Sequence, residues 1–190
     1  MNDAAARLTT ARVALRPFTP ADVDLLVALD NDPAVMHYIN GGLPVPRQEI
    51  ADVTLPAFLG YHARGDVYGF WAAIERSTGR FLGWFHFRPG DGDGPLEPEL
   101  GYRLHTHAWG RGIATEVSQA LIDDGFAHHD VERVRAETMV VHVASRRVME
   151  KCGMRLVRTF HADWPVRIDG DEHGDVEYAI TRQEWAAGGR

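Results

Sequence analysis

Apolar residues in the second half of this chain recur at spacings that predict helices and strands in alternation. Ile113, Val117 and Leu121 fall on one face of a helix expected over 112–127. The remaining segments of this half are predicted as strands at 99–104, 133–141, 155–160 and 176–180, a helix at 144–152, and a closing helix that begins at Thr181. Glu184 completes a capping box at the start of this last helix.

The first half is predicted to hold a β-hairpin preceded by helices. The apolar runs 67–75 and 81–88 are joined by a Ser-Thr-Gly segment, which is a composition typical of turns. The helices expected before the hairpin run from Thr19 to Leu29, over a short stretch from Asp32, and over 47–63. A loop rich in Gly, Asp and Pro is expected at 89–98. Together these elements predict an α/β (α+β) fold with one mixed sheet.

Composition and charge narrow the class of protein. The 190 residues, 45% of them apolar, predict a single domain over 1–190 with a core at about 12–185. The net charge of −7 disfavours nucleic-acid binding, which needs clustered Lys and Arg. Neither a signal peptide nor an apolar run of roughly 18 residues is present, so no membrane partner is expected. The single cysteine, Cys152, cannot form an internal disulfide, and we expect a cytoplasmic protein.

A glycine pair between a predicted strand and a predicted helix suggests binding chemistry. Gly110 and Gly112 permit a tight turn, and the helix that starts there offers unpaired N–H groups at the positive end of its dipole. Such a turn can receive a phosphate, and Arg111 can add a charge-assisted contact. A glycine pair at a helix start is more often a simple turn, so the pair alone leaves both interpretations open.

Neighbouring residues make this segment more specific. Trp-Gly-Arg-Gly-Ile-Ala-Thr-Glu at 109–116 resembles the coenzyme loop of the GCN5-related N-acetyltransferases (GNAT), in the form common in their ribosomal-protein N-acetyltransferase-like (RimJ/RimL-like) branch. Trp109 departs from the Gln or Arg that usually opens this loop. His-Val-Ala-Ser-Arg-Arg-Val-Met-Glu-Lys-Cys-Gly-Met at 142–154 resembles a second family segment. The resemblance runs from about Val13 to Trp185.

This resemblance implies a fold and a co-substrate. The expected fold is a single-domain GNAT fold, with a mixed, mostly antiparallel central sheet flanked by helices and splayed central strands that hold acetyl-CoA. Backbone N–H groups near 102–104 are expected to polarise the thioester carbonyl. The implied coenzyme-binding residues are Tyr102, Arg103, Leu104, Trp109, Gly110, Arg111, Gly112, Ile113, Ala114, Thr115, His142 and Ser145. His105 and His107 lie two residues apart, but no third ligand accompanies them, so no metal is expected.

Two departures from the family pattern concern the leaving group. Many relatives carry Asn where His142 stands, and a Tyr that donates a proton to the departing thiolate where Met149 stands. Methionine cannot donate a proton. Three alternatives are therefore open: Ser145 or water reprotonates the thiolate, or the thiolate leaves unassisted, since a thiol with a pKa of about 8.5 is a fair leaving group.

Glu99 is the candidate general base, because relatives often have a glutamate there that acts directly or through water. A solvated carboxylate at a strand end is the alternative interpretation. The resemblance implies direct transfer of acetyl, in a ternary complex, to a primary amine of a protein N-terminus or a small molecule. The alternative function is a catalytically degenerate CoA-binding regulatory module, which His142 and Met149 would favour and Glu99 and the glycine loop disfavour. Whether the chain forms a homodimer is left open.

Overall fold

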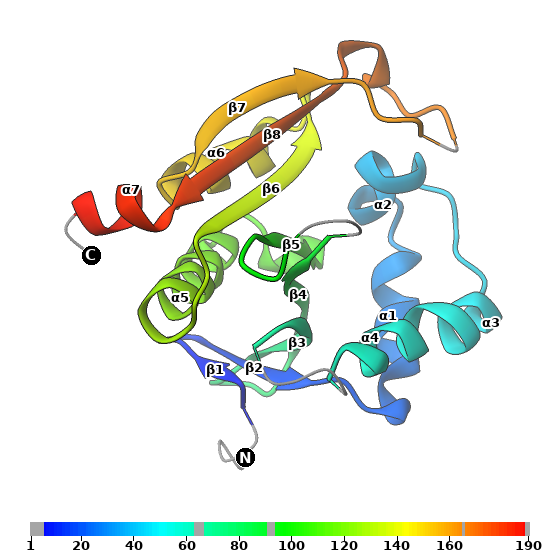
Figure 1. The fold of residues 1–190 in the computed structure, drawn as a ribbon. Coiled ribbons are helices and arrows are strands. Elements are labelled where there is room, and N and C mark those ends of the chain that lie inside the picture. The colour runs from blue at the N-terminus through cyan, green and yellow to red at the C-terminus, as the bar shows by residue number, and fades with distance from the viewer. Residues whose placement is uncertain (1–5, 63–66, 91–93, 165, 189–190) are drawn as a thin grey trace.

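The computed structural model describes residues 6–62, 67–90, 94–164 and 166–188, and its centre is one twisted sheet of eight strands in the order β1-β2-β3-β4-β5-β6-β8-β7 (Figure 1). The strands are β1 (Leu8–Thr9), β2 (Val13–Pro17), β3 (Gly69–Glu75), β4 (Phe81–Pro89), β5 (Pro98–Leu104), β6 (Arg133–Met139), β7 (Arg155–Phe160) and β8 (Asp175–Thr181). The helices are α1 (Val23–Asp30), α2 (Pro33–Asn40), α3 (Arg47–Glu49), α4 (Leu55–His62), α5 (Ile113–His128), α6 (Val143–Lys151) and α7 (Arg182–Ala187). Every neighbouring pair of strands is antiparallel except β5 and β6.

The expected fold class, one mixed sheet flanked by helices, is confirmed. The predicted hairpin is β3 and β4, and the alternating second half forms β5, α5, β6, α6, β7, β8 and α7. The sequence analysis missed β1 and β2. β1 has only two residues, and the partner of β2 on its other side is β3, where Leu15 pairs with Ala73. β2 and β3 are far apart along the chain, so their pairing produces no local sequence pattern.

The helix expected over 47–63 is interrupted, and its last residue lies outside the described part of the chain. A π-helical turn, Ile50–Thr54, separates α3 from α4. Pro56 lies in the first turn of α4 and has no N–H to donate to the carbonyl of Asp52, which lies inside the π turn. The proline thus explains the local change in helical hydrogen bonding.

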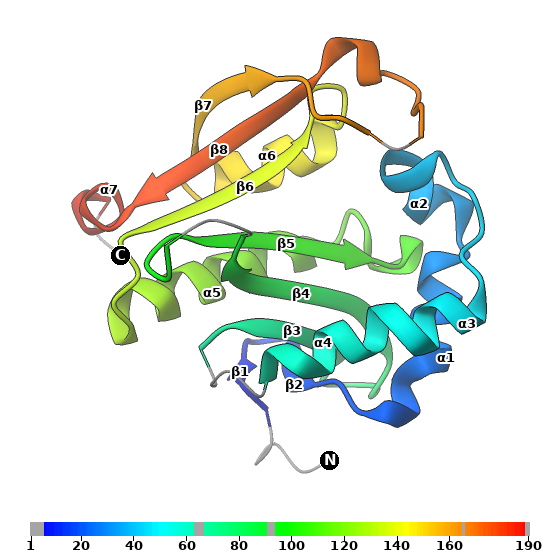
Figure 2. The same ribbon diagram turned by 45° about the vertical axis from the view of Figure 1, so that its right-hand side comes forward.

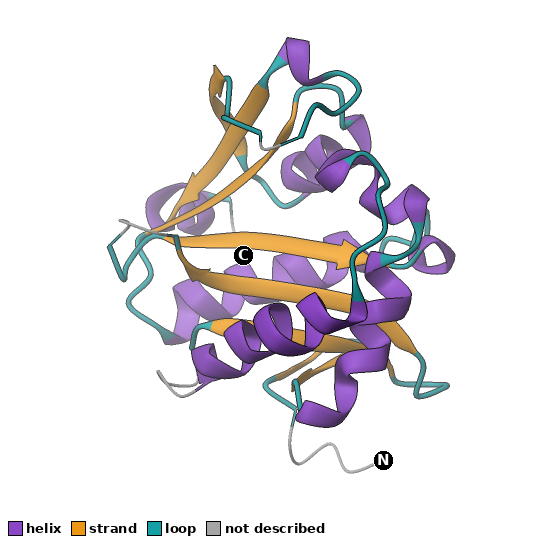
Figure 3. Ribbon diagram, turned by 90° about the vertical axis from the view of Figure 1, so that its right-hand side faces the viewer, coloured by secondary structure: helices purple, strands orange, loops and turns teal. Residues whose placement is uncertain are grey.

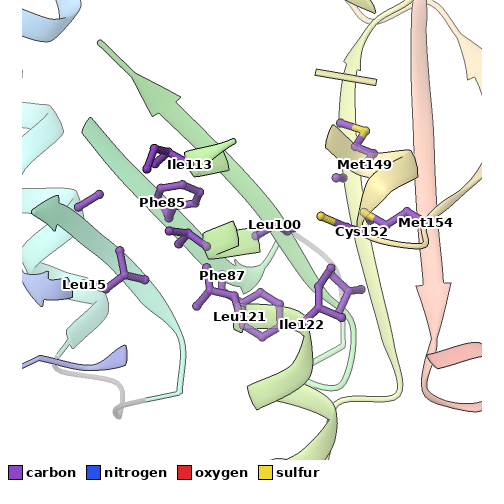
Figure 4. Packing of buried hydrophobic residues seen from close by; sticks show 14 of the residues in the cluster. Leu15, Phe85, Phe87, Leu100, Ile113, Leu121, Ile122, Met149, Cys152 and Met154 are labelled. Atoms are coloured by element: carbon purple, nitrogen blue, oxygen red, sulfur yellow. The ribbon is translucent and has the colours of Figure 1, made fainter. Parts of the chain in front are cut away.

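Two hydrophobic clusters lie on opposite faces of the sheet, because neighbouring residues of a strand point to opposite sides. Trp84 of β4 belongs to the aromatic cluster under α1 to α4, which cover one face (Figure 3). Phe85 belongs to the cluster on the other face, which α5 and α6 cover. Figure 4 shows Met149 of α6 and Cys152 at the end of this helix as members of this second cluster.

The sheet divides between β5 and β6, which are the one parallel pair among the strands that the structure describes. β5 and β6 share a single register pair, Glu99 with Arg135, and then separate toward their carboxyl ends (Figure 2). One half of the sheet therefore contains β1 to β5, and the other contains β6, β8 and β7. In the part of the chain that the structure describes, every helix is too short or too polar to span a lipid bilayer.

Candidate active site

The turn between β5 and α5 has the backbone geometry of an anion cradle. Gly110 and Gly112 have φ values of 68° and 76°, in the left-handed region that side chains disfavour. The backbone N–H groups of residues 110–115 donate to no partner within the described residues. Unpaired N–H groups at the start of a 16-residue helix attract negative charge. The glycine loop predicted from the sequence is therefore formed, and phosphate binding by it stays a prediction.

Ion pairs fasten this turn to the β1–β3 side of the sheet. Arg111 pairs with Glu75 of β3, which places a carboxylate next to the turn. Arg12 pairs with Glu116 at 2.6 Å and donates a hydrogen bond of 2.7 Å to the carbonyl of Arg111. The Arg111 guanidinium could therefore contact a phosphate only while it also pairs with the Glu75 carboxylate. The N–H groups, rather than this guanidinium, are the free donors of the turn.

The side chains of β5 divide between the two faces of the sheet. Arg103 points toward α1, where it pairs with the buried Asp30 at 2.5 Å and lies over the ring of Trp84. Its side chain is committed to this ion pair, so only its backbone is free for a coenzyme. Leu104 is a core residue, and its carbonyl accepts a hydrogen bond of 2.8 Å from the indole of Trp109. The Trp109 side chain is therefore hydrogen-bonded to the last residue of β5.

Beyond Glu99, β5 has no strand partner on its β6 side among the described residues. Tyr102 extends from this open edge toward α6 and lies beside Ser145. Burial raises the pKa of Tyr102 to about 12, although its contact with the Ser145 hydroxyl acts in the opposite direction. The phenol stays protonated throughout the physiological range. The structure thus brings together two predicted site residues from the two halves of the sheet.

His142 and Met149 occupy different parts of α6. His142 precedes the first turn, and its ring stacks on Tyr38 of α2 with 4.4 Å between the ring centroids. Burial lowers the pKa of His142, and the nearby His37 lowers it further. Met149 is buried on the core face of α6. These two residues therefore have packing roles in addition to any contact with a coenzyme.

Glu99 lies at the base of the splay, in contact with two residues that the sequence analysis did not single out. Its Oε2 is 3.2 Å from Arg135 of β6, and its Oε1 is 3.5 Å from His86 of β4. Burial raises the pKa of Glu99, but contact with His86 and the charges of Arg135 and Arg88 outweigh it, so the pKa lies below its usual value. No local pattern marks His86, because only sheet pairing places it next to β5.

His105 and His107, which lie two residues apart, contact each other. The rings of His105 and His107 stack with centroids 5.2 Å apart. Across the described ranges, no three His, Cys, Asp or Glu side chains are grouped in a way that could hold a metal ion. Burial lowers the pKa of both imidazoles. The pair is an aromatic contact at the entrance to the glycine turn.

A groove of about 530 Å³ runs along α5 from the glycine turn. Gly112, Thr115 and Gln119 line its α5 side, and Lys151 lies across from them at the end of α6. Thr9 and Thr10 form its third side. A ligand bound at the glycine turn can therefore extend along the surface of α5.

Comparisons with known proteins agree with this geometry. The family described as Acetyltransferase (GNAT) domain matches residues 12–155. The FsC-acetyl coenzyme A-N(2)-transacetylase of Aspergillus fumigatus is 32% identical over 184 residues, covering 94% of this chain and 77% of that protein. RimL, a ribosomal L7/L12 alpha-N-protein acetyltransferase solved with coenzyme A, has the same fold, with a TM-score of 0.76 and 19% identity over 93% of this chain and 97% of that one. The aminoglycoside acetyltransferase AAC(6')-Ib, also solved with coenzyme A, has a TM-score of 0.73 and 19% identity, covering 94% of this chain and 99% of that one.

The match covers most of the chain, and it includes the glycine turn, the splayed strands and all of α6. The agreement with RimL is an agreement of fold. On these grounds the chain is an acyltransferase enzyme that belongs to the GNAT family of acetyltransferases.

Proposed function

We propose that this enzyme transfers the acetyl group of acetyl-CoA to a primary amine by direct attack in a ternary complex. The observation that carries this proposal is the row of free N–H groups at 110–115, placed beside strands that part after one register pair. The turn supplies donors for a pyrophosphate, and the open edge of β5 supplies backbone groups for the extended arm of the coenzyme. Acetyl-CoA contributes the activated thioester when bound.

The residues that would hold the coenzyme follow from this arrangement. The N–H groups from Gly110 to Thr115 would bind the pyrophosphate, with Ile113 and Ala114 contributing only through their backbone. Trp109 would hold the turn against the end of β5. Tyr102, Arg103 and Leu104 would offer backbone groups to the arm and to the thioester carbonyl. His142 and Ser145 would line the opposite side of the gap.

The hydroxyls of Tyr102 and Ser145 are our candidates for stabilising the departing thiolate. Methionine at position 149 offers no donor, and the contact of the Tyr102 and Ser145 hydroxyls between β5 and α6 supports this assignment. A phenol with a pKa of about 12 gives up its proton poorly, so Tyr102 would stabilise the thiolate by hydrogen bonding. Ser145 would pass a proton to the sulfur only while it receives the proton that the amine nitrogen loses. Glu99 belongs to the opposite, proton-accepting side of the site, where it acts directly or through a neighbouring group.

For the acceptor, we propose a small molecule with a primary amine. The relative from Aspergillus fumigatus, which is named for transfer to an N(2) position, matches 94% of this chain at 32% identity. RimL, named for a protein α-amine, shares the fold at 19% identity, and its likeness extends to the fold alone. A panel of small amines and N-terminal peptides, with release of free CoA as the signal, would distinguish the two classes.

Coenzyme binding is tested by calorimetry with a charge placed on the turn. Thr115→Asp puts a carboxylate in the first turn of α5, where it favours the helix but repels a phosphate. We expect acetyl-CoA to bind the wild type and to bind this variant at least tenfold more weakly, which is about 1.4 kcal/mol. Thr115→Asn is the matched neutral control and should bind within about threefold of the wild type. Equal binding by Thr115→Asp would refute the proposed pyrophosphate site.

A further inference from the structure

The gap between β5 and β6 contains a second carboxylate, Glu137, which no sequence motif marks. Glu137 follows Arg135 by two residues on β6, so it lies on the same face as Glu99 and faces the widening part of the gap. Its Oε1 accepts a hydrogen bond of 2.8 Å from Arg135, whereas its Oε2 has no hydrogen-bond partner in the described residues. The side chain is 32% exposed, so a solute can approach this carboxylate.

Both oxygens of Glu99 face a nitrogen-bearing side chain, whereas among the described residues only one oxygen of Glu137 does. Its Oε2 lies 3.2 Å from Nη2 of Arg135, and its Oε1 lies 3.5 Å from Nε2 of His86. Arg135 therefore connects the two carboxylates, holding Glu99 with one nitrogen and Glu137 with the other. A carboxylate with both oxygens in contact with nitrogen is a weak proton acceptor, because each contact stabilises its ionised form.

His86 indicates that this cluster is built for a polar ligand. The residue is only 7% exposed, and neither ring nitrogen has a well-aligned hydrogen bond within the described part of the chain. Its ring lies against the backbone of Gly101, where a Cβ would be 2.4 Å from Nε2. Buried polar groups are almost always hydrogen-bonded, so an imidazole with unused capacity beside the Glu99 carboxylate points to a missing partner.

The position of Glu137 in the sheet is unfavourable for stability. It stands directly opposite Glu177 of β8, and like charges in that relation repel each other. Glu177 is held by Arg133 at 2.6 Å and by Arg158 at 2.7 Å, so Arg135 alone pairs with Glu137 among the described residues. A carboxylate kept at such a position is better explained by a function than by folding.

We propose that Glu137 binds the ammonium group of the acceptor and takes its proton, and that Glu99 is a positioning residue that acts through Arg135. This inference rests on the proposed acetyltransferase function and assigns the acceptor as a cationic primary amine. The ammonium first gives a proton to the Glu137 carboxylate. The neutral nitrogen then bonds to the thioester carbon, the carbon–sulfur bond breaks, the second nitrogen proton passes to the thiolate, and Glu137 releases its proton to water.

The electrostatic surroundings support this division of roles. Burial raises the pKa of Glu137, and the charges of Glu99 and Glu177 act in the same direction, so the pKa lies above its usual value although Arg135 and Arg158 lower it. A carboxylate with a raised pKa is better matched to accept a proton than one with a lowered pKa. Its exposure gives it a route to water for releasing that proton.

The test compares Glu137→Gln with Glu99→Gln, using the amine that the wild type acetylates fastest among spermidine, L-ornithine methyl ester and a Ser-Ala dipeptide amide. We expect Glu137→Gln to lower kcat/KM by about 100-fold or more and to abolish the acidic limb of its pH profile. Glu99→Gln should shift that limb and lower kcat/KM by a smaller factor. Glu172→Gln, on the exposed turn before β8, is the matched control and should behave as the wild type.

Two readouts separate this inference from the proposed function. Calorimetry with acetyl-CoA should give the same affinity for Glu137→Gln and the wild type. The variant should melt close to the wild-type temperature, because the lost repulsion from Glu177 offsets the lost ion pair with Arg135. Carbon-13 titration of the glutamate carboxyl groups should place the pKa of Glu137 above that of Glu99, whether or not an acceptor is found. The reverse order of the two, or full activity of Glu137→Gln, would overturn the inference. A wild type that fails to bind acetyl-CoA would instead overturn the proposed function.

Discussion

The rings of Tyr38 and His142 stack with centroids 4.4 Å apart and planes 25° from parallel, which links α2 to the start of α6. The two elements belong to opposite sides of the splay: α2 packs with the helical layer over β3 and β4, and α6 packs behind β6 and β8 (Figure 2). Tyr38 has non-helical backbone angles of φ −93° and ψ 16° at a kink in α2. The stack therefore couples the position of α2 to the first turn of α6.

We expect the stack to stabilise the protein by about 0.5–1.5 kcal/mol beyond the burial of each ring. A double-mutant cycle with Tyr38→Ala and His142→Ala, followed by urea unfolding, measures this coupling energy. His142→Asn should remove the stack and keep acetyl-CoA binding, because many relatives carry Asn there. Strict additivity of the two alanine substitutions would show that the rings do not interact.

Stability should fall as the pH falls below about 6.5. Burial lowers the pKa of His86 and of His142, so both are neutral in the folded protein while the unfolded chain binds protons near the ordinary value. Their contribution is present at higher pH and is lost as the pH falls, by at most about 1.4 kcal/mol per pH unit for each histidine. Urea unfolding between pH 8 and pH 5 checks the slope, which should be smaller in His142→Asn. A slope that is flat over this range would contradict the neutral state of both imidazoles.

Removing one partner of the buried Arg103–Asp30 ion pair should be strongly destabilising. The pair is 2.5 Å long and Asp30 is nearly inaccessible, so Asp30→Ala leaves a buried guanidinium without its carboxylate. We expect a loss of about 3–5 kcal/mol in urea unfolding. The double variant Asp30→Leu/Arg103→Met should recover much of this loss and bind acetyl-CoA like the wild type. Loss of coenzyme binding in a stable double variant would show that the Arg103 side chain takes part in binding.

Tyr102→Phe tests the proposed role of the phenol. The variant keeps the ring that packs against Phe85 and removes only the hydroxyl beside Ser145. We expect kcat to fall about tenfold, while the affinity for acetyl-CoA changes little, because the hydroxyl acts on the leaving sulfur. Ser145→Ala should have a similar effect, and the two should not be additive. Tyr68→Phe serves as the control. Tyr68 lies directly before β3, and its substitution should leave kcat unchanged.

Local patterns were enough to predict the elements whose stabilising contacts are close in sequence. The hairpin of β3 and β4, the amphipathic α5 and the capping box at Thr181 follow from turn composition, helical spacing and a four-residue motif. β2 was missed because its partner on the sheet is more than fifty residues away. The interruption before α4 was missed because the prediction of one continuous helix over 47–63 did not take Pro56 into account.

The candidate site was predictable only in part, for a related reason. Gly110 and Gly112 lie within a single turn, so a local stretch of sequence is enough to predict their backbone role. Arg111 and Arg103 were expected at the coenzyme, yet both side chains are engaged by carboxylates on other elements, Glu75 and Asp30. No spacing along the chain reveals such partners.

By itself, the sequence determined the family, the fold class and the glycine turn, since each depends on residues that are neighbours or lie at fixed helical and strand spacing. The tertiary structure decided which charges meet. The contacts of Glu99 with His86 and Arg135, and the place of Glu137 opposite Glu177, arise from pairing among four strands separated along the chain. The proton affinity of each carboxylate depends on its neighbours in space and on burial. The protonation chemistry of the site can therefore be inferred only from the folded sheet.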